Sequence, residues 1–554
     1  MALRVDDARS NETAIITCLV SVLAVVYLAW NVKKSRKANA KLPPGPPGLP
    51  VVGYLPFLGT TDLHKKFTEL SGVYGPIFKL WLGNKLCVVV SSPSLIRQVV
   101  RDQDTTFANR DPPKAALVVS YGGNDIAWSN YGPEWRKLRK FFVGKMMSNA
   151  SLDACYALRK QEVKNTIRDL YNNDNKIGMP IDIGELSFST LVCAIQNMLW
   201  GEALEIREKG TTNLGAGLKF KLAELMVLAG TPNISDVFPM LSWLDIQGIE
   251  RRAKKISLWL ENVINSTVEQ HRNKESTVEG EERAGKIFEG SRNKNFLQLL
   301  LELQENDDSA SSISMNQFKA VLMDIITAGT DTTATMVEWT MAELMQHPQV
   351  MKKVQEELAQ VVGMDSCVEE FHLSRLKYLD AVVKETFRLH PAVPLLVPRR
   401  ASESGSIGGY TIPKDTTLML NVWAIHRDPQ LWDNPLEFRP ERFLNVGVES
   451  KFDYSGNNFQ YLPFGSGRRM CAGIPLAERM LMFVLASLLH SFEWELPAGT
   501  KLNLSEKFGI VIKKKEPLYG NKVSVVKGEE ATGNNIEGRN FTCLVAEFAA
   551  VFYR

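Results

Sequence analysis

Cys471 is the cysteine of this 554-residue chain whose surroundings suggest chemistry, because it lies in the run Phe464-Gly-Ser-Gly-Arg-Arg-Met-Cys-Ala-Gly473. A buried thiolate that binds a metal carries a negative charge, so it needs hydrogen-bond donors and positive potential around its sulfur. The glycines let backbone amides approach the sulfur, and the apolar helix expected to begin near Ile474 directs its positive N-terminal end at the same place. The spacing therefore predicts that Cys471 is a thiolate metal ligand.

The other cysteines form no comparable pattern. The seven cysteines are odd in number, widely spaced and never arranged as Cys-x-x-Cys, which argues against a disulfide framework and against a zinc site. Taken alone, any one of them is best interpreted as a small buried apolar side chain in a reducing compartment. Only its local context separates Cys471 from the rest.

A second polar group interrupts an expected helix. The run Ala328-Gly-Thr-Asp-Thr-Thr333 lies inside a helical stretch that begins near Met315. Glycine costs about 1 kcal/mol relative to alanine within a helix, and threonine hydroxyls compete for backbone carbonyls. Either the helix is locally loosened there without a role, or these residues serve a function.

Two further spacings place polar side chains on one face of a helix. Glu385 and Arg388 are three residues apart on a helix that a proline must end, and Arg442 follows in the run Phe-Arg-Pro-Glu-Arg-Phe. Trp135 and Arg139 are one helical turn apart, so both can reach the same carboxylate. Each spacing taken alone is also common as ordinary surface decoration of a helix.

Taken in order, these four motifs resemble the cytochrome P450 family of haem-thiolate oxygenases, over about residues 40–518. The pattern F-x-x-G-x-R-x-C-x-G, with Phe464 and Gly473 at its ends, is similar to the haem-binding loop of that family. The resemblance implies that Cys471 is the proximal ligand of a b-type haem. It also implies that the haem propionates are held by Trp135, Arg139, Arg399 and Arg469.

The same resemblance implies roles for the other motifs. A-G-x-D-T-T looks like the distal helix motif of the family, in which a local widening of the helix holds oxygen and water. Thr332 would then hydrogen-bond dioxygen, and Asp331 would relay protons from bulk solvent. Glu385, Arg388 and Arg442 would form a structural network that braces the haem loop.

The residue patterns and the resemblance agree on a mainly α fold with a small β region. Residues 76–82 and 86–90 predict a β-hairpin, helical signals dominate from Pro93, and residues 409–420 form another β-rich stretch. The cytochrome P450 fold, with haem between a distal and a proximal helix, would occupy residues 53–519.

Two segments stand apart from this domain pattern. The charged run 272–294 lacks periodicity, and we expect it to be a solvated loop between helices. Residues 520–554 form a C-terminal tail that matches nothing usual in the family. Disorder, a splice or gene-model artefact, and a new module are the open interpretations of this tail.

The N-terminus predicts a membrane anchor. Residues 13–32 carry no charge, and about twenty helical residues at 1.5 Å each match the ~30 Å hydrocarbon core of a bilayer. A basic cluster follows, so the positive-inside rule places residues 1–12 in the lumen and the catalytic domain in the cytosol. A cleaved signal peptide is the alternative, but its basic cluster would precede the apolar stretch. With a basic, proline-rich linker at 33–52, we predict a single-pass protein of the endoplasmic reticulum membrane.

Composition narrows the partners. A net charge of +3 with 45% apolar and 23% charged residues gives no reason to expect nucleic acid. No complete dinucleotide fingerprint or flavin module is visible, so electrons must come from another protein. The resemblance implies an NADPH-dependent flavoprotein reductase. The candidate docking residues, for which solvated surface charge is the alternative, are Arg136, Lys137, Lys140, Lys145 and Arg468.

Substrate contacts can be placed only by resemblance. They would come from largely apolar segments without a buried charge, at 115–126, 214–228, 325–328, 393–397 and 508–511. Such a pocket favours a small, neutral, lipophilic plant metabolite, since residues 121–135 look like the plant microsomal branch of the family. A sesquiterpene-like terpenoid is our first prediction, and a flavonoid or other phenylpropanoid is the alternative.

Two hypotheses lie outside oxygen insertion. A haem-thiolate isomerase or dehydratase would not need the acid and alcohol of Asp331 and Thr332. A membrane-anchored haem-binding scaffold would bind haem and form no product.

Overall fold

A computed structural model of the chain describes residues 41–59, 62–172, 179–201, 214–283, 295–304, 312–444 and 452–525, together with Ser21 and Val25. Apart from those two positions, the predicted anchor at 13–32 lies outside the described residues. Among the described helices, α19 (Ile474–Ser491) is long and apolar enough to cross a membrane. Most of α19 is buried inside the body, as expected for a core helix.

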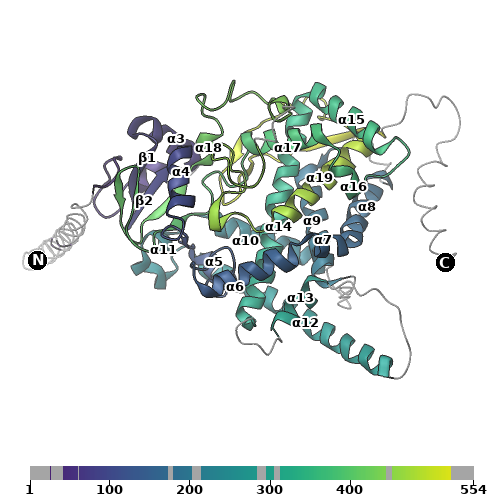
Figure 1. Ribbon diagram of the computed structural model, residues 1–554, viewed down its shortest axis with the longest axis horizontal. Coiled ribbons are helices and arrows are strands. Elements are labelled where there is room, and N and C mark those ends of the chain that lie inside the picture. Colours follow the sequence, from purple (N-terminus) through teal and green to yellow (C-terminus); the bar gives the residue numbers. More distant parts are fainter. Residues whose placement is uncertain are drawn as a thin grey trace, which may run out of the picture.

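Helices fill most of the body, and the sheet that contains β1 and β2 lies at one side of it next to α3 and α4 (Figure 1). The longer helices are α3 (Leu63–Tyr74), α6 (Pro133–Phe141), α8 (Tyr156–Asn172), α9 (Ile183–Trp200), α10 (Leu214–Gly230), α12 (Ile249–Arg283), α13 (Phe296–Gln304), α14 (Met315–Gln346), α15 (Pro348–Val362), α17 (Lys377–Leu389) and α19. Short helical segments are α2 (Leu55–Leu58), α4 (Pro93–Arg97), η1 (Gln98–Asp102), α5 (Lys114–Val119), η2 (Phe142–Met146), α7 (Asn149–Ala154), α11 (Ile234–Val237), η4 (Pro239–Leu244), α16 (Glu370–Leu373), α18 (Val422–Ile425), η5 (Pro440–Phe443) and η6 (Gly467–Arg469). A mainly α fold with a small β region is therefore confirmed.

The five-stranded sheet has the order β1-β2-β8-β5-β3. Its strands are β1 (Ile77–Leu82), β2 (Lys85–Val90), β8 (Thr417–Leu420), β5 (Arg399–Arg400) and β3 (Asn109–Arg110). Strands β1 and β2 form the predicted hairpin, in which Ile77 pairs with Val90, and Gly83 takes the positive φ that its turn requires. Strand β8 then pairs in parallel with β2, which joins the 409–420 region to the N-terminal hairpin.

Smaller sheets lie beside the helices. They consist of β4 (Ile181–Asp182), β12 (Tyr519–Val525) and β9 (Phe492–Glu495); of β6 (Gly405–Ile407) and β7 (Tyr410–Ile412); and of β10 (Glu506–Lys507) and β11 (Lys513–Lys514). Because β12 pairs with both β4 and β9, residues 520–525 belong to the folded body. The domain boundary predicted at residue 519 is therefore too early.

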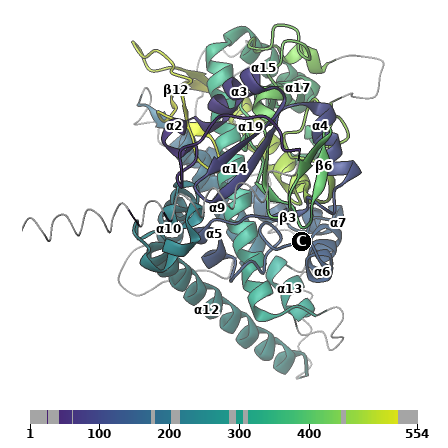
Figure 2. The same ribbon diagram turned by 90° about the vertical axis from the view of Figure 1, so that its left-hand side faces the viewer.

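Helix α14 runs through the middle of the helical body (Figure 2) and is buried along most of its length. Ser314 and Gln317 form a capping box at its start, which confirms the predicted beginning near Met315. Gly329 faces α9, where a Cβ atom would lie only 2.9 Å from Ile195 Cδ1. The glycine therefore allows the two helices to pack closely, which offsets its low helix propensity.

Helix α14 is assigned as α-helix from Met315 to Gln346, and the side-chain hydroxyls of Thr332 and Thr333 donate to the carbonyls of Ala328 and Gly329 one turn earlier. Such side-chain bonds compete for the carbonyls of the helical ladder. One local expectation is wrong. The charged run 272–294 is not wholly a loop, since α12 continues to Arg283 and projects from the lower edge of the body (Figure 2). Charged residues are good helix formers, and the amphipathic first half of α12 carries the helix into them.

Candidate active site

A cavity of about 300 Å³ lies between α14 and the loop that precedes α19. One wall is the face of α14 that presents Ala328 and Thr332. The opposite wall is the loop from Phe464 to Gly473, which places Cys471 beside the cavity. Most of the other lining side chains are apolar. The fold thus brings together two motifs that lie far apart in the sequence.

The cysteine loop has the close-packed geometry that its glycines predict. The amide of Cys471 donates to the carbonyl of Phe464 at 3.0 Å and closes the loop. Gly467 has a φ of 69°, and a side chain there would collide with the carbonyl of Val100. A Cβ atom at Gly473 would lie 3.9 Å from the Cys471 sulfur, so the backbone passes close beside it.

The environment of the Cys471 thiol fits a metal ligand. Protein atoms surround the residue except where its side chain is exposed to the cavity. Burial raises the pKa of the thiol, while the amides of Gly473 and Ile474 and the charge of Arg139 act in the opposite direction. Donors alone therefore do not ionise the sulfur, and a cation in the cavity would supply the remaining stabilisation of a thiolate.

Four arginines gather beside the same cavity: Arg110, Arg139, Arg399 and Arg469. Burial together with the charges of Arg399 and Arg139 lowers the pKa of Arg469 to about 9. Mutually repelling guanidinium groups in a buried site require anions nearby. The acid Asp104 pairs with Arg399 at 3.1 Å, which leaves positive charge for further carboxylates. The cluster fits the two propionates of haem b.

Arg110 is a member of this cluster that the sequence reasoning missed. Burial, followed by the charges of Arg469 and Arg399, lowers its pKa. Its guanidinium donates to the carbonyls of Ala127 and Val397. In the sequence Arg110 is an isolated arginine in a short strand, and no motif separates it from a surface residue.

Trp135 contributes differently from what its spacing suggests. The residue is buried and does not line the cavity, and its indole N–H donates to the carbonyl of Ile126 at 3.0 Å. Its ring instead lies 4.4 Å from the Arg469 guanidinium and 5.4 Å from that of Arg139. These cation–π contacts hold both arginines toward the cavity, so we place Trp135 as a support for the clamp.

The predicted proton and oxygen residues of α14 face different ways. Thr332 lines the cavity, and its hydroxyl donates to the carbonyl of Ala328 at 2.7 Å. Asp331 is buried away from the cavity lining and pairs with Lys513 of β11. The other carboxylate oxygen of Asp331 has no hydrogen-bond partner within the described residues. Because Lys513 is 42% exposed, the pair connects the interior of α14 with solvent.

Glu385, Arg388 and Arg442 come together as one buried network. Glu385 accepts from Arg388 at 2.7 and 2.8 Å and from Arg442 at 3.0 Å, and it also accepts from the amide of Arg439 at 2.9 Å. Arg388 donates further to the carbonyls of His426, Pro435 and Glu437. The network thereby ties α17 to the segment that leads into the cysteine loop.

The cavity wall differs from the predicted substrate segments. Ile126, Ile325, Ala328, Val393 and Val397 lie on it, whereas the described residues of 214–228 and 508–511 do not. Asp324 also lines the cavity, one position before the predicted segment 325–328. Inside the predicted segment 115–126, Asp125 is 1% exposed, so the expectation that these segments hold no buried charge is wrong.

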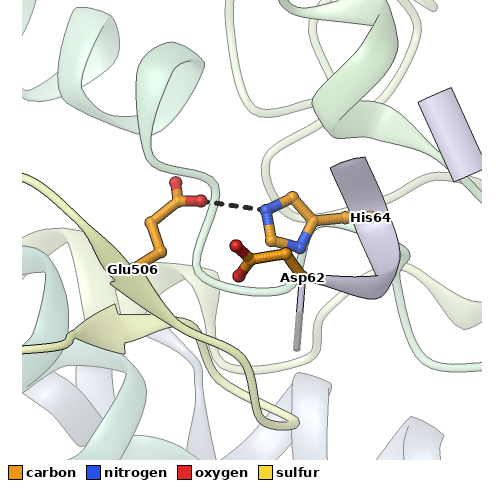
Figure 3. A group of neighbouring side chains, drawn as sticks. All are labelled: Asp62, His64 and Glu506. Carbon is orange, nitrogen blue, oxygen red and sulfur yellow. Dashed lines mark hydrogen bonds and ion pairs between the residues drawn. The ribbon is translucent and has the colours of Figure 1, made fainter. Parts of the chain in front are cut away.

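A second polar cluster lies outside the cavity, where Asp62, His64 and Glu506 approach one another (Figure 3). The Nε2 atom of His64 is 2.9 Å from Glu506. Lys65 places its ammonium 3.0 Å from Glu506 and 3.5 Å from Asp62, so these carboxylates already hold a cation. We assign the cluster to fastening α3 onto β10.

Comparisons with known proteins agree with this geometry. The model of the family described as cytochrome P450 matches residues 43–520. Flavonoid 3′-monooxygenase of Petunia hybrida is 39% identical over 483 residues, which cover 86% of this chain and 91% of the relative. Carnosic acid synthase of Rosmarinus officinalis is 38% identical over 90% of this chain and 97% of the relative. A zebrafish cytochrome P450 structure with progesterone superposes with a TM-score of 0.68 at 26% identity, covering 83% of this chain and 99% of that one.

Proposed function

Because the chain belongs to the cytochrome P450 family and is a haem-thiolate monooxygenase of plant secondary metabolism, we propose that it inserts oxygen into a flavonoid or a similar phenylpropanoid. The observation that carries this proposal is the apolar cavity with Cys471 on one wall and Thr332 on the other. A polar group on the wall, Asp324, suits a lipophilic substrate that also bears hydroxyl groups. The relatedness to flavonoid hydroxylases points to the same class.

The residues around the cavity divide the work of the reaction. Haem b, when bound, supplies the activation of dioxygen and the transfer of one oxygen atom. Cys471 would hold the iron, while Arg110, Arg139, Arg399 and Arg469 would hold the propionates.

Two residues of α14 would handle the protons. The Thr332 hydroxyl donates its single proton to the Ala328 carbonyl, so it would accept a hydrogen bond in the cavity, or donate one there after rotating away from Ala328. Asp331 would deliver protons from solvent to that side of the cavity, with half-exposed Lys513 as its outer partner.

Electrons would arrive from an NADPH-dependent reductase on the cysteine side of the molecule. The guanidinium groups of Arg136 and Arg468 lie 5.8 and 5.5 Å from the ring of Tyr131, so two of the predicted docking residues share one face. Lys140 and Lys145 are also exposed. Lys137 instead pairs with Glu134 at 3.0 Å and is less available. An acidic partner surface fits such a face.

We also propose that the protein sits on the endoplasmic reticulum membrane. Met240 and Trp243 of η4 are 85% and 80% exposed, and Leu241, Leu244 and Ile246 are exposed beside them. An exposed apolar patch of this kind enters the interface of a bilayer. The chain without residues 1–32 should still bind vesicles, and Trp243→Ser combined with Met240→Ser should release it. Equal vesicle binding by the truncated chain with and without the two serine substitutions would contradict a membrane contact at this apolar patch.

A terpenoid substrate, our first prediction from the sequence, is retained as the second candidate. The observation that favours it is the similarity to carnosic acid synthase over nearly the whole chain. The apolar cavity accepts a terpene skeleton as readily as an aromatic one.

The test is expression of the full chain in microsomes with a plant reductase, followed by product analysis with flavonoids and terpenes. We expect an oxygenated flavonoid that requires NADPH and oxygen and disappears in Cys471→Ser. Oxygenated terpenes alone would select the second candidate. Turnover without NADPH and oxygen would indicate an isomerase or dehydratase. Bound haem without any product from either class would indicate a scaffold.

A further inference from the structure

One carboxylate joins the cysteine loop to the arginine cluster, and none of the sequence motifs accounts for it. Asp104 lies in the turn between η1 and β3, and its side chain is 11% exposed. Its Oδ1 atom accepts a hydrogen bond from the guanidinium of Arg399 at 3.1 Å. Its Oδ2 atom accepts one from the backbone amide of Arg468 at 2.8 Å. Asp104 therefore holds a buried arginine of the cavity wall with one oxygen and the cysteine loop with the other.

The cysteine loop is shaped to receive this carboxylate. Gly467 has a φ of 69°, and a Cβ atom there would lie 3.0 Å from Oδ2 of Asp104, so only glycine lets the loop approach so closely. Arg399 in turn donates to the carbonyl of Ser466 at 2.9 Å. The carboxylate, the guanidinium and the loop thus close a ring of hydrogen bonds, which fixes Arg399 at the cavity wall.

The charge of Asp104 acts on the arginine cluster as well. Burial lowers the pKa of Arg139, Arg399 and Arg469, and the negative charge of Asp104 acts in the opposite direction on each of them. Within the described part of the chain, the contact of Asp104 with Arg399 is the only ion pair that the four cavity arginines form. The charge of Asp104 therefore bears on the place where the propionates would be held.

We propose that Asp104 is a positioning residue that fixes Arg399 toward a haem propionate and, through its charge, lowers the reduction potential of the bound haem. A carboxylate near an electron acceptor repels the electron that reduction adds, so a neutral side chain in its place raises the potential. Arg468, whose amide is held by the same carboxylate, is also a candidate docking residue for the reductase. The proposed docking face and the propionate clamp thus meet at Asp104.

The alternative is that Asp104 only keeps the cysteine loop in shape. Asp104→Asn separates the two roles, because asparagine keeps the size of the side chain and an oxygen acceptor but removes the charge. Asp104→Ser removes the charge with a smaller side chain, and Asp104→Glu keeps the charge. Asp102→Asn is the matched control, since Asp102 lies two positions away and meets Arg97 at 3.8 Å, with side chains that are 46% and 58% exposed.

The five proteins, wild type included, are compared as full-length, haem-loaded chains without substrate. The midpoint potential is measured by spectroelectrochemical titration, and haem loss is measured as the rate of haem transfer to apomyoglobin. Because neither measurement needs a substrate, the result does not depend on whether the chain oxidises a flavonoid or a terpenoid.

We expect Asp104→Asn and Asp104→Ser to raise the midpoint potential and to speed haem transfer by about tenfold, the scale of one charge-assisted hydrogen bond. Asp104→Glu should return the potential toward that of wild type, and Asp102→Asn should change neither quantity. Faster haem transfer at an unchanged potential would leave Asp104 a purely structural role and overturn the proposal. An equal shift of the potential in Asp102→Asn, or haem transfer no faster than in wild type for both uncharged variants, would overturn it as well.

Discussion

Replacing Glu385 by glutamine should destabilise the whole domain, because this carboxylate and its partner Arg388 form the fully buried centre of the network. Glu385 and Arg388 are both 0% exposed, and Glu385 accepts four hydrogen bonds of 2.7 to 3.0 Å. The amide of glutamine would direct N–H groups at an arginine that has only donors. It would also leave the charge of Arg388 uncompensated.

The size of the expected loss in unfolding free energy follows from the burial of both Glu385 and Arg388. Removing one member of a buried ion pair costs about 3–5 kcal/mol, which is a large share of the 5–15 kcal/mol that holds a typical domain together. Because the network ties α17 to the segment before the cysteine loop, we expect haem to dissociate at lower urea concentration in Glu385→Gln. Urea unfolding of the haem-loaded protein, followed by both circular dichroism and haem absorbance, measures the two effects.

Glu441→Gln is the matched control for this experiment. Glu441 is an acid in the neighbouring segment that pairs with Lys353 at 2.7 Å, but the two side chains are 42% and 53% exposed. Surface pairs contribute about 0–1 kcal/mol, so its unfolding should change little. Equal destabilisation by the two substitutions would refute the reasoning that burial of the network determines its importance.

Other consequences can be checked in parallel. Thr332→Ala should lower the amount of product formed per NADPH by about 10²-fold, the lower end of the range for general acid catalysis, and should raise peroxide release. Thr332→Ser should keep most of the yield. An unchanged product yield per NADPH in the alanine variant would exclude the hydroxyl from the mechanism. Lys513→Met should slow turnover, as judged from the pH profile of the turnover rate, and should leave the substrate affinity unchanged. Lys513→Arg should restore the turnover rate. A pH profile unaffected by the methionine substitution would contradict proton delivery through Asp331 and Lys513. Burial raises the pKa of Glu506, but the hydrogen bonds from His64 and Lys65 and the charge of Arg427 outweigh burial. The pKa of Glu506 is therefore lowered from an ordinary 4.5 to about 2. Glu506 thus stabilises the fold above pH 4.5 and loses this contribution as the pH falls toward 2, so Glu506→Gln should flatten the acid limb of thermal stability; an identical acid limb would exclude that role.

Local sequence patterns were sufficient to predict a feature wherever the residues that form it are close in the chain. The hairpin of β1 and β2, the start of α14 at its capping box and the glycine-rich loop around Cys471 all depend on contacts within a few residues. Glu385 and Arg388 likewise sit on adjacent turns of one helix. Such features are encoded in spacing, which is why they could be predicted.

Contacts between residues that are far apart in the chain leave no such pattern in the sequence. Arg110 looked like an isolated arginine, and its role emerges only where β3 brings it beside Arg399 and Arg469. The end of α12 and the pairing of β12 were also missed, since helix propagation and strand pairing depend on what the rest of the fold presents.

The sequence by itself determined the family and the mainly α architecture and predicted Cys471 as the thiolate ligand, because each of these depends on short motifs whose glycines, prolines and charges act on their immediate neighbours. The tertiary structure alone decided the character of the cavity wall. Asp324 and Asp125 are 199 residues apart, and Asp324 accepts from the amide of Ile126, next to Asp125, only because the fold lays α14 against this segment. The same holds for Asp331 and Lys513, whose pairing links α14 to solvent. Electrostatics in a buried site depends on which groups face each other, and a linear pattern does not contain that information.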